Sequence, residues 1–397
     1  MSESTKVEYL DILRLRYVAA SKKTRSQIID ELCRNTGIHR KSAIRALRSK
    51  MSGRRKGSGR KQHYLPETIY QLRKLWLKTD QMCSKKLKKA LPEWISKTLI
   101  NQDVKEQLLK MSASTMDRHI KPHRAQYRRK SNTGTRPGLK LLKNIVPVKT
   151  LGNIVSRSGF IEADTVAHCG GSLLGEFIWS LTFTDRFSGW TENRAVWGKH
   201  SINVHAAIED IESSLPFEIV EFNVDNGSEF LNHRLIEYFQ PGGPHKRRQF
   251  VMTRSRSYHK NDNAHVEQKN WTHVRQIFGY ERFEFKELLP IMNEIYHVQN
   301  MLTNFFHPQM KLKSKVRVGT KITKKYDEPQ TPYRRVLADP AVTDENKKKL
   351  TDLFETLNPF HLRERREELL AHFYKTKKQL ELNKELANSA SNVIPLW

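Results

Sequence analysis

The order of strand-like and helix-like segments between residues 159 and 280 constrains the fold more than any other feature of the sequence. Segments 160–166, 177–185 and 190–196 are rich in aromatic and β-branched residues and are separated by glycine-containing turns, which predicts three strands. A helix over 201–214, a strand over 217–224 and a helix over 228–239 are expected to follow. A strand over 250–253 and a helix over 263–279 complete the series. The sequence therefore predicts an α/β domain with a five-stranded sheet.

Three acidic residues stand at informative places in this series. Asp164 lies in "ADTVAH" on the first predicted strand, Asp225 in "DNGSEF" at the end of the fourth, and Glu267 in "NDNAHVEQKNW" near the start of the last helix. Each has an ordinary structural interpretation alone, since Asp225 suits a turn before Gly227 and Glu267 suits the positive end of a helix dipole. Three strands, helix, strand, helix, strand, helix is the order of the ribonuclease-H-like fold with its mixed sheet, in which the three positions face one another.

These three segments resemble the motifs of the DDE integrase-core transposases of bacterial insertion sequences, which are relatives of the retroviral integrases. The resemblance spans residues 155–285 and implies that Asp164, Asp225 and Glu267 are the catalytic, metal-binding acids. Asp225 and Glu267 are separated by more residues than is usual in the family, which an insertion around "QPGGPHKRRQ" explains. Asn226 and Gly227 are expected to shape the loop that lets a DNA backbone approach Asp225.

A second departure concerns the helix of Glu267. Trp271 and Val274 stand where the family often has basic residues one and two turns after the glutamate. Lys269 and Arg275 are therefore expected to make the DNA contacts of this helix.

The chemistry explains why carboxylates are needed. Breaking or joining a phosphodiester requires an activated attacking oxygen and a stabilised leaving oxygen, which two divalent ions about 4 Å apart supply. Mg²⁺, or Mn²⁺ in its place, prefers oxygen ligands. His168, His265 and Cys169 also lie near these acids in the sequence but lack the spacing of zinc ligands, so we interpret them as packing or substrate-contacting residues.

The charge distribution points to a polyanionic partner. The formal net charge is +29; most of it lies in the first 150 residues, whereas residues 151–240 are net acidic. A basic front end is expected to bind double-stranded DNA, and the acidic region to hold cations. Three cysteines far apart in the sequence, without a CxxC pair, favour a reducing cytoplasm. For a DNA-binding protein there, association with the nucleoid is expected. No apolar run has transmembrane length, so no membrane partner is expected.

Residues 1–50 have the spacing of a helix-turn-helix domain. Thr24 or Ser26 is expected to cap a helix that runs through Leu32, Gly37 permits a tight turn, and a second helix with Ile44 and Leu47 buried covers residues 40–47. Its outer face offers Arg40, Lys41, Arg45 and Arg48 to a major groove. The alternative is an ordinary helical hairpin with a solvated basic face.

Two basic linkers flank a second helical domain. Residues 51–65, with Arg54 and Arg55, and residues 123–152, with Arg128 and Arg129, are expected to contact DNA phosphates or to remain solvated. Residues 66–122 are predicted to be helical and to end in a second helix-turn-helix, capped by Ser112 or Ser114, that presents Arg118 and Lys121.

The catalytic core is predicted to cover residues 153–304, including a helix over 285–302 that packs on it. Residues 305–340 are expected to form a small basic β-rich module or arm, and residues 341–397 to form helices over 344–357 and 359–387. The apolar side of the last helix, which carries Leu369 and Phe373, suits either assembly with another protomer or packing within the chain.

The sequence and its family resemblance together predict a DNA transposase. It would bind the ends of its element, cleave their 3′ ends and join them to target DNA as a dimer or larger homo-oligomer. Two alternatives remain open at this point: a transposase-derived regulator that only binds DNA, and a nuclease of the same fold that cuts without joining.

Overall fold

The computed structural model describes residues 3–49, 64–124, 126, 155–224, 251–254, 264–318 and 320–391. The chain divides into two compact units, Met1–His63 and Tyr64–Trp397. Several predictions lie outside the described residues: the helix over 228–239 and the roles of Asp225, Asn226, Gly227, Arg54, Arg55, Arg128 and Arg129.

The described part of the first unit forms the helices α1 (Glu3–Ala19), α2 (Lys22–Thr36) and α3 (Arg40–Arg48). Gly37 ends α2 with φ +72°, a left-handed conformation that glycine adopts without steric cost, as predicted. The predicted cap was wrong, because the hydroxyl of Ser21 accepts the hydrogen bond from the Thr24 N–H. The buried face of α3 also differs from the prediction, since Ala43 and Leu47 are buried whereas Ile44 is only partly buried.

The second unit is built around a five-stranded sheet with the order β3-β2-β1-β4-β5. Its strands are β1 (Phe160–Ala167), β2 (Ile178–Asp185), β3 (Thr191–Trp197), β4 (Glu221–Val224) and β5 (Val251–Arg254). The β1–β2 and β2–β3 pairs are antiparallel, whereas β1 pairs with β4, and β4 with β5, in parallel. This mixed topology is that of the ribonuclease-H-like fold, which confirms the predicted fold class.

Helices make up most of the rest of this unit. Before the sheet come α4 (Pro66–Lys78), α5 (Ser84–Ser96), α6 (Gln102–Lys110) and α7 (Ala113–Arg124), and β3 is followed by α8 (Ser201–Ser214). After β5 come α10 (Ala264–Lys269), the π-helix η2 (Asn270–Arg275), α11 (Gln276–Phe278) and α12 (Leu288–Phe306). The chain then forms the ribbon β6 (Leu312–Val318) and β7 (Lys321–Tyr326), followed by α13 (Pro332–Leu337), α14 (Asp344–Thr356) and α15 (Pro359–Ser391).

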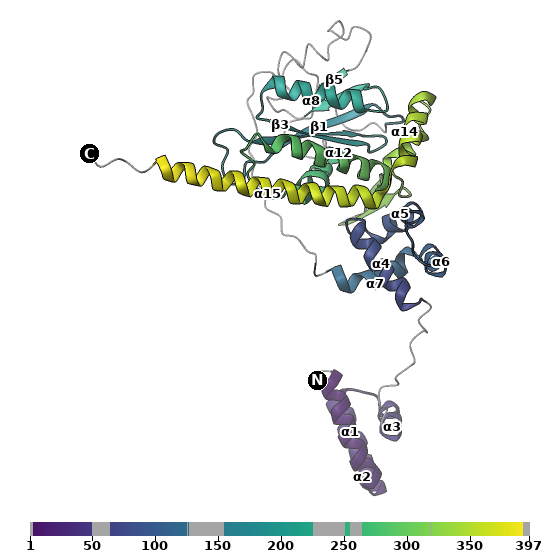
Figure 1. Ribbon diagram of the computed structural model, residues 1–397. Coiled ribbons are helices and arrows are strands. Elements are labelled where there is room, and N and C mark those ends of the chain that lie inside the picture. Colours follow the sequence, from purple (N-terminus) through teal and green to yellow (C-terminus); the bar gives the residue numbers. More distant parts are fainter. Residues whose placement is uncertain are drawn as a thin grey trace, which may run out of the picture. The chain divides into compact units, whose positions relative to one another are not determined.

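Helices cover both faces of the sheet (Figure 1). Val204, Ile208 and Ile211 of α8 belong to the same buried cluster as the sheet residues Ile161 and Phe183. On the other side, α12 contributes Met292 and Ile295 to a cluster that also contains Leu369 and Phe373 of α15. Over this part of its length the last helix therefore packs within the chain. This is one of the two arrangements predicted for its apolar side.

The fourth strand is shorter than the predicted span 217–224. Phe217 and Ile219 are buried, but residues 217–220 do not pair as a strand. The N–H groups of Val220 and Glu221 both donate to the carbonyl of Gly159, an irregular connection that brings Gly159 to φ +107°. At residues 217–220 the apolar composition therefore predicted burial correctly, but the prediction that they pair as a strand was wrong.

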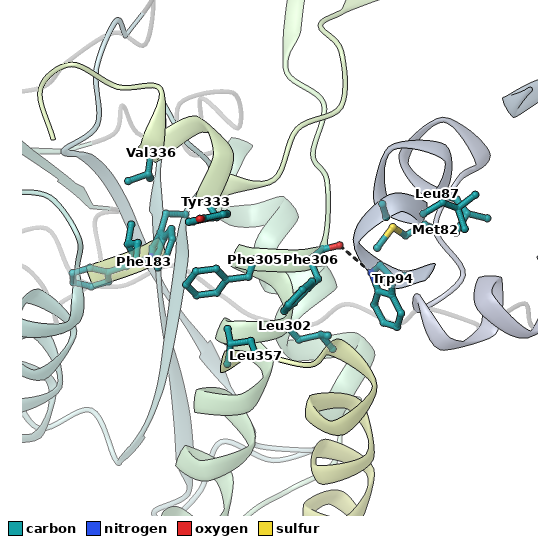
Figure 2. Close-up of a cluster of buried hydrophobic side chains, with 14 of the residues drawn as sticks. Met82, Leu87, Trp94, Phe183, Leu302, Phe305, Phe306, Tyr333, Val336 and Leu357 are labelled. Carbon is teal, nitrogen blue, oxygen red and sulfur yellow. Dashed lines mark hydrogen bonds between the residues drawn. The ribbon is translucent and has the colours of Figure 1, made fainter. Parts of the chain in front are cut away.

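The helices α4–α7 pack against the rest of the second unit through Trp94 of α5. The indole of Trp94 is completely buried, and its Nε1 donates a 3.4 Å hydrogen bond to the carbonyl of Phe306 at the end of α12 (Figure 2). Its ring also meets the edge of Phe360, with ring centroids 5.1 Å apart. Ser112, one of the two predicted caps, accepts a hydrogen bond from the Thr115 N–H at the start of α7.

No helix in the described part of the chain is both long enough and apolar enough to span a bilayer.

Candidate functional site

Asp164 lies in the middle of β1, opposite Thr182 of β2. Its Oδ1 accepts a 2.8 Å hydrogen bond from the N–H of Thr165. Its Oδ2 accepts a 2.7 Å hydrogen bond from Nδ2 of Asn270, the first residue of η2. The carboxylate is therefore oriented by its own strand on one side and by the helical segment that follows Glu267 on the other.

The parallel pairing of β1 and β4 fixes where β4 ends relative to Asp164. The last described residue of β4, Val224, is the partner of Ala163. Asp164 follows Ala163 in the sequence, and Asp225 follows Val224. Asp225 itself lies outside the described residues, so its participation in the site stays a prediction.

Glu267 is an exposed residue of α10, and a buried acid of β1 holds the start of this helix. Glu162 is completely buried, and its Oε2 accepts hydrogen bonds of 3.1 Å from the N–H groups of both His265 and Val266. The first N–H groups of a helix have no partner within the helix, and a carboxylate also suits the positive end of its dipole. Glu162 therefore fastens the helix of Glu267 to the strand of Asp164.

The electrostatics of Glu162 reflect this enclosed position. Burial raises the pKa of the Glu162 carboxyl to about 7, although its backbone hydrogen bonds to α10 and the nearby Arg186 act in the opposite direction. The negative charge of Glu267 raises the same pKa further, which places Glu267 within electrostatic reach of β1. Nε of Arg186 lies 3.5 Å from Oε1 of Glu162.

The side-chain amide of Asn270 supplies the observation that bears on a metal. Its Nδ2 is used by Asp164, while its Oδ1 is buried and has no hydrogen-bond partner among the described residues. An acceptor left open beside a carboxylate, with Glu267 on the preceding turn, forms a set of oxygen donors that fits a hard divalent cation. Within the described ranges no group of three His, Cys, Asp or Glu side chains forms a metal site, and the third predicted ligand, Asp225, lies outside them.

Two basic residues of this helical segment are engaged inside the protein. Lys269 is only 7% exposed, and its Nζ lies 3.4 Å from the carbonyl of Gly189. The guanidinium of Arg275 donates to the carbonyls of Gly279 and Ala167. Both were predicted to contact DNA, and this stays a prediction; in this conformation each donates to backbone carbonyls.

The basic residues predicted in the helical regions lie at the surface. Lys41, Arg45 and Arg48 are exposed on α3. Arg40 is exposed too, but it forms an ion pair with Asp30 and donates to the hydroxyl of Ser26. In the second unit, Arg118 and Lys121 are exposed on α7.

Of the two histidines near the acids, His168 has a structural role. His168 is completely buried, its Nε2 lies 2.7 Å from the hydroxyl of Ser180, and its ring stacks on Phe283. Burial lowers the pKa of His168 to about 3. His265, by contrast, is exposed on α10. Packing, one of the two predicted interpretations, therefore describes His168.

Two features of this site escaped the sequence analysis. Glu162 was not singled out, although it precedes Asp164 by two residues and so projects from the same face of the strand. Its signal in the sequence was a second acid in a strand that is mostly apolar. The contact of Asn270 with Asp164 was not singled out either, and this bond joins residues too far apart in the sequence for any local pattern to reveal.

Comparisons with known proteins give a relative by sequence and likenesses to solved structures. No protein-family model matches the chain. The "Uncharacterized protein y4rM" of Sinorhizobium fredii (strain NBRC 101917 / NGR234) is 34% identical over 343 residues, which cover 84% of this chain and 96% of the relative. The crystal structure of the catalytic core domain of BIV integrase aligns with 46% of this chain and 95% of its own, with a TM-score of 0.28 and 14% identity. A likeness of this size carries no functional argument, and the fold assignment rests on the strand order.

Proposed function

Because the chain belongs to the same family as y4rM, whose name states no activity, we propose its function from its own site: it is a DNA transposase that cleaves element ends and joins them to target DNA. The observation that carries the proposal is the docking of the Glu267 helix onto the strand of Asp164. Glu162 and Asn270 make this connection with hydrogen bonds of 3.1 and 2.7 Å.

In this proposal Asp164, Asp225 and Glu267 hold two Mg²⁺ or Mn²⁺ ions. When bound, such a pair supplies Lewis acidity at the attacking and leaving oxygens of a phosphodiester. The protein's own groups do the positioning: Asn270 orients the carboxylate of Asp164, and Glu162 fixes the start of α10. Neither the cleavage nor the joining of DNA requires a covalent link between enzyme and DNA.

DNA binding is assigned to the basic surfaces outside the core. Lys41, Arg45 and Arg48 of α3 are exposed, and a helix of this kind fits a major groove. Arg118 and Lys121 of α7 are proposed as a second contact. Since both element ends must be held together for joining, we propose that the active form is at least a dimer.

A strand-transfer assay tests the proposal against its two alternatives. The substrates are duplexes copied from the DNA that flanks the gene on either side, with a supercoiled plasmid as target. Cleaved and joined products with the wild-type protein, both lost in Asp164→Asn, Asp225→Asn and Glu267→Gln, would support a transposase. Glu209→Gln is the matched control, because Glu209 is an exposed acid of α8 with a 51% exposed side chain.

Other outcomes separate the alternatives. Shifted but uncut DNA with the wild-type protein would favour a regulator that only binds. Cleavage without joined product would favour a nuclease. Activity retained in Glu267→Gln would remove this residue, and with it the proposed mechanism.

A further inference from the structure

A cavity of about 690 Å³ lies beside the helical segment of Glu267, walled by the α4–α5 turn, η2, the end of α12 and the start of α15. Basic side chains from α5, α10, η2, the end of α12 and α15 also line it. They are Lys86, Lys269, His273, His307, Arg363 and Arg366. Asp80 and Glu367 supply the carboxylates of its lining.

The two arginines are matched by these two acids. Arg363 and Arg366 both contact Oδ1 of Asp80, at 2.7 and 2.8 Å. Arg363 also lies 2.7 Å from Glu367. Asp80 has φ +51°, a conformation that is unusual for a residue other than glycine, and the paired arginines hold it there.

The two lysines have no such match. Lys269 is 7% exposed, and the described residues place only the carbonyl of Gly189, 3.4 Å away, near its amine. Lys86 has no carboxylate partner among the described residues. Lys86 and Lys269 thus line one cavity, and neither is paired with a carboxylate among the described residues.

A buried histidine adds an unused hydrogen-bonding atom. His273 is 5% exposed, and its Nδ1 lies 2.8 Å from the hydroxyl of Thr272. Its Nε2 is buried and has no hydrogen-bond partner among the described residues, and the same holds for Nε2 of His307. Buried polar atoms are nearly always satisfied in folded proteins, by protein groups, water or a ligand.

We propose that this cavity is a binding site for a phosphate group, with Lys86, Lys269 and His273 as its donors. A phosphate brings the missing negative charge and several acceptor oxygens, and charge-assisted hydrogen bonds to it are stronger than neutral ones. The group belongs either to a nucleic acid or to a small phosphorylated molecule. This inference does not depend on the proposed function, since the site includes none of the three predicted catalytic acids.

The test uses the full-length protein and inorganic phosphate at constant ionic strength, with NaCl replaced step by step. The melting temperature of the wild-type protein should rise with phosphate and saturate, because a ligand that binds the folded state stabilises it. In Lys269→Met and Lys86→Met the half-saturating concentration should increase by about tenfold or more, which corresponds to one lost charge-assisted hydrogen bond. Lys85→Met, an exposed neighbour on α5, should behave as wild type.

Several results would overturn the proposal. A wild-type melting temperature that responds only to ionic strength would mean that water alone fills the cavity. An equal response in Lys85→Met and Lys269→Met would assign phosphate binding to the protein surface. Methionine removes a buried charge at similar length, so folding of both variants is expected and is checked by near-UV circular dichroism.

A second arm identifies the source of the phosphate. If short duplex DNA abolishes the phosphate-dependent rise in melting temperature, and Lys269→Met removes this competition, the group is a DNA phosphate. If DNA and phosphate stabilise the protein independently, the group is a small molecule. Because the first arm contains no DNA or divalent metal, a failed strand-transfer assay and a failed phosphate titration are separate results.

Discussion

Nδ2 of Asn270 and Oδ2 of Asp164 lie 2.7 Å apart, although the two residues belong to a π-helix and a central strand. The oxygen of the same amide, Oδ1 of Asn270, has no hydrogen-bond partner among the described residues. The same side chain thus orients the carboxylate and presents a further acceptor beside it.

Removing this amide should impair chemistry while sparing DNA binding. We expect Asn270→Ala to lower the rates of cleavage and joining by about 10- to 100-fold, the usual cost of losing a group that orients a metal ligand. The measurement is single-turnover cleavage with DNA affinity determined in parallel. Gln268→Ala, which changes an exposed amide of the same helical segment, is the control. Equal losses in both variants would show that the effect comes from the helix surface.

The clamp between Glu162 and α10 gives a prediction about stability. Glu162→Ala removes the acceptor of two helix N–H groups and should lower the free energy of unfolding by about 1–2 kcal/mol or more, as other lost helix caps do. Glu162→Gln keeps an acceptor oxygen and should lose less. Urea unfolding measures both values. Hydrogen exchange of the 264–270 segment should accelerate in the alanine variant, and unchanged exchange there would contradict the clamp.

His168 gives a prediction about pH. Its folded-state pKa of about 3 lies below the ordinary histidine value, so the stability it contributes is complete above pH 6.5 and is lost as pH falls toward 3. Between pH 7.5 and 5 this loss amounts to roughly 2 kcal/mol, at about 1.4 kcal/mol per pH unit below the unfolded pKa. His168→Gln should be less stable than wild type at pH 7.5, and the difference should shrink by that amount at pH 5. A constant difference across this range in urea unfolding would mean that His168 does not titrate as described.

The exposed face of α3 gives a prediction about salt. Arg45→Ala and Lys41→Ala should each weaken DNA binding and reduce the slope of log K against log salt concentration by about 1, the effect of one lost phosphate contact. Lys23→Ala on α2 is the matched control, since Lys23 is also exposed. If the slope changes equally in all three variants, the effect would come from the net charge of the protein and not from contacts between the α3 face and DNA.

The sheet was predictable because its local signals agree with its tertiary environment. β1, β2 and β3 combine aromatic and β-branched residues with glycine-containing turns, and their observed bounds lie within one or two residues of the predicted ones. The prediction failed where burial and pairing separate, as at Phe217 and Ile219, which are buried outside any strand. Apolar character reports burial alone, whereas pairing depends on the neighbouring strand.

The site was less accessible to sequence reasoning. The positions of Asp164 and Glu267 on a strand and a helix follow from local pattern, and Asp225 remains a prediction. Asn270 lies 106 residues from Asp164 along the chain, and Val266 lies 104 residues from Glu162. Such contacts depend on how the last helix crosses the sheet, which no local spacing encodes.

The π-helix η2 has a consequence for how contacts are transferred between related proteins. Its hydrogen bonds span five residues rather than the four of an α-helix, so side chains after Asn270 are rotated away from the positions that a regular helix would give them. A regular α-helix that starts at Glu267 would therefore predict the wrong direction for the side chain of Arg275. In the structure this side chain donates to the carbonyl of Ala167. When this segment is aligned with a regular α-helix of a related protein, residues after Asn270 should be shifted by one position before a basic side chain is matched to a phosphate.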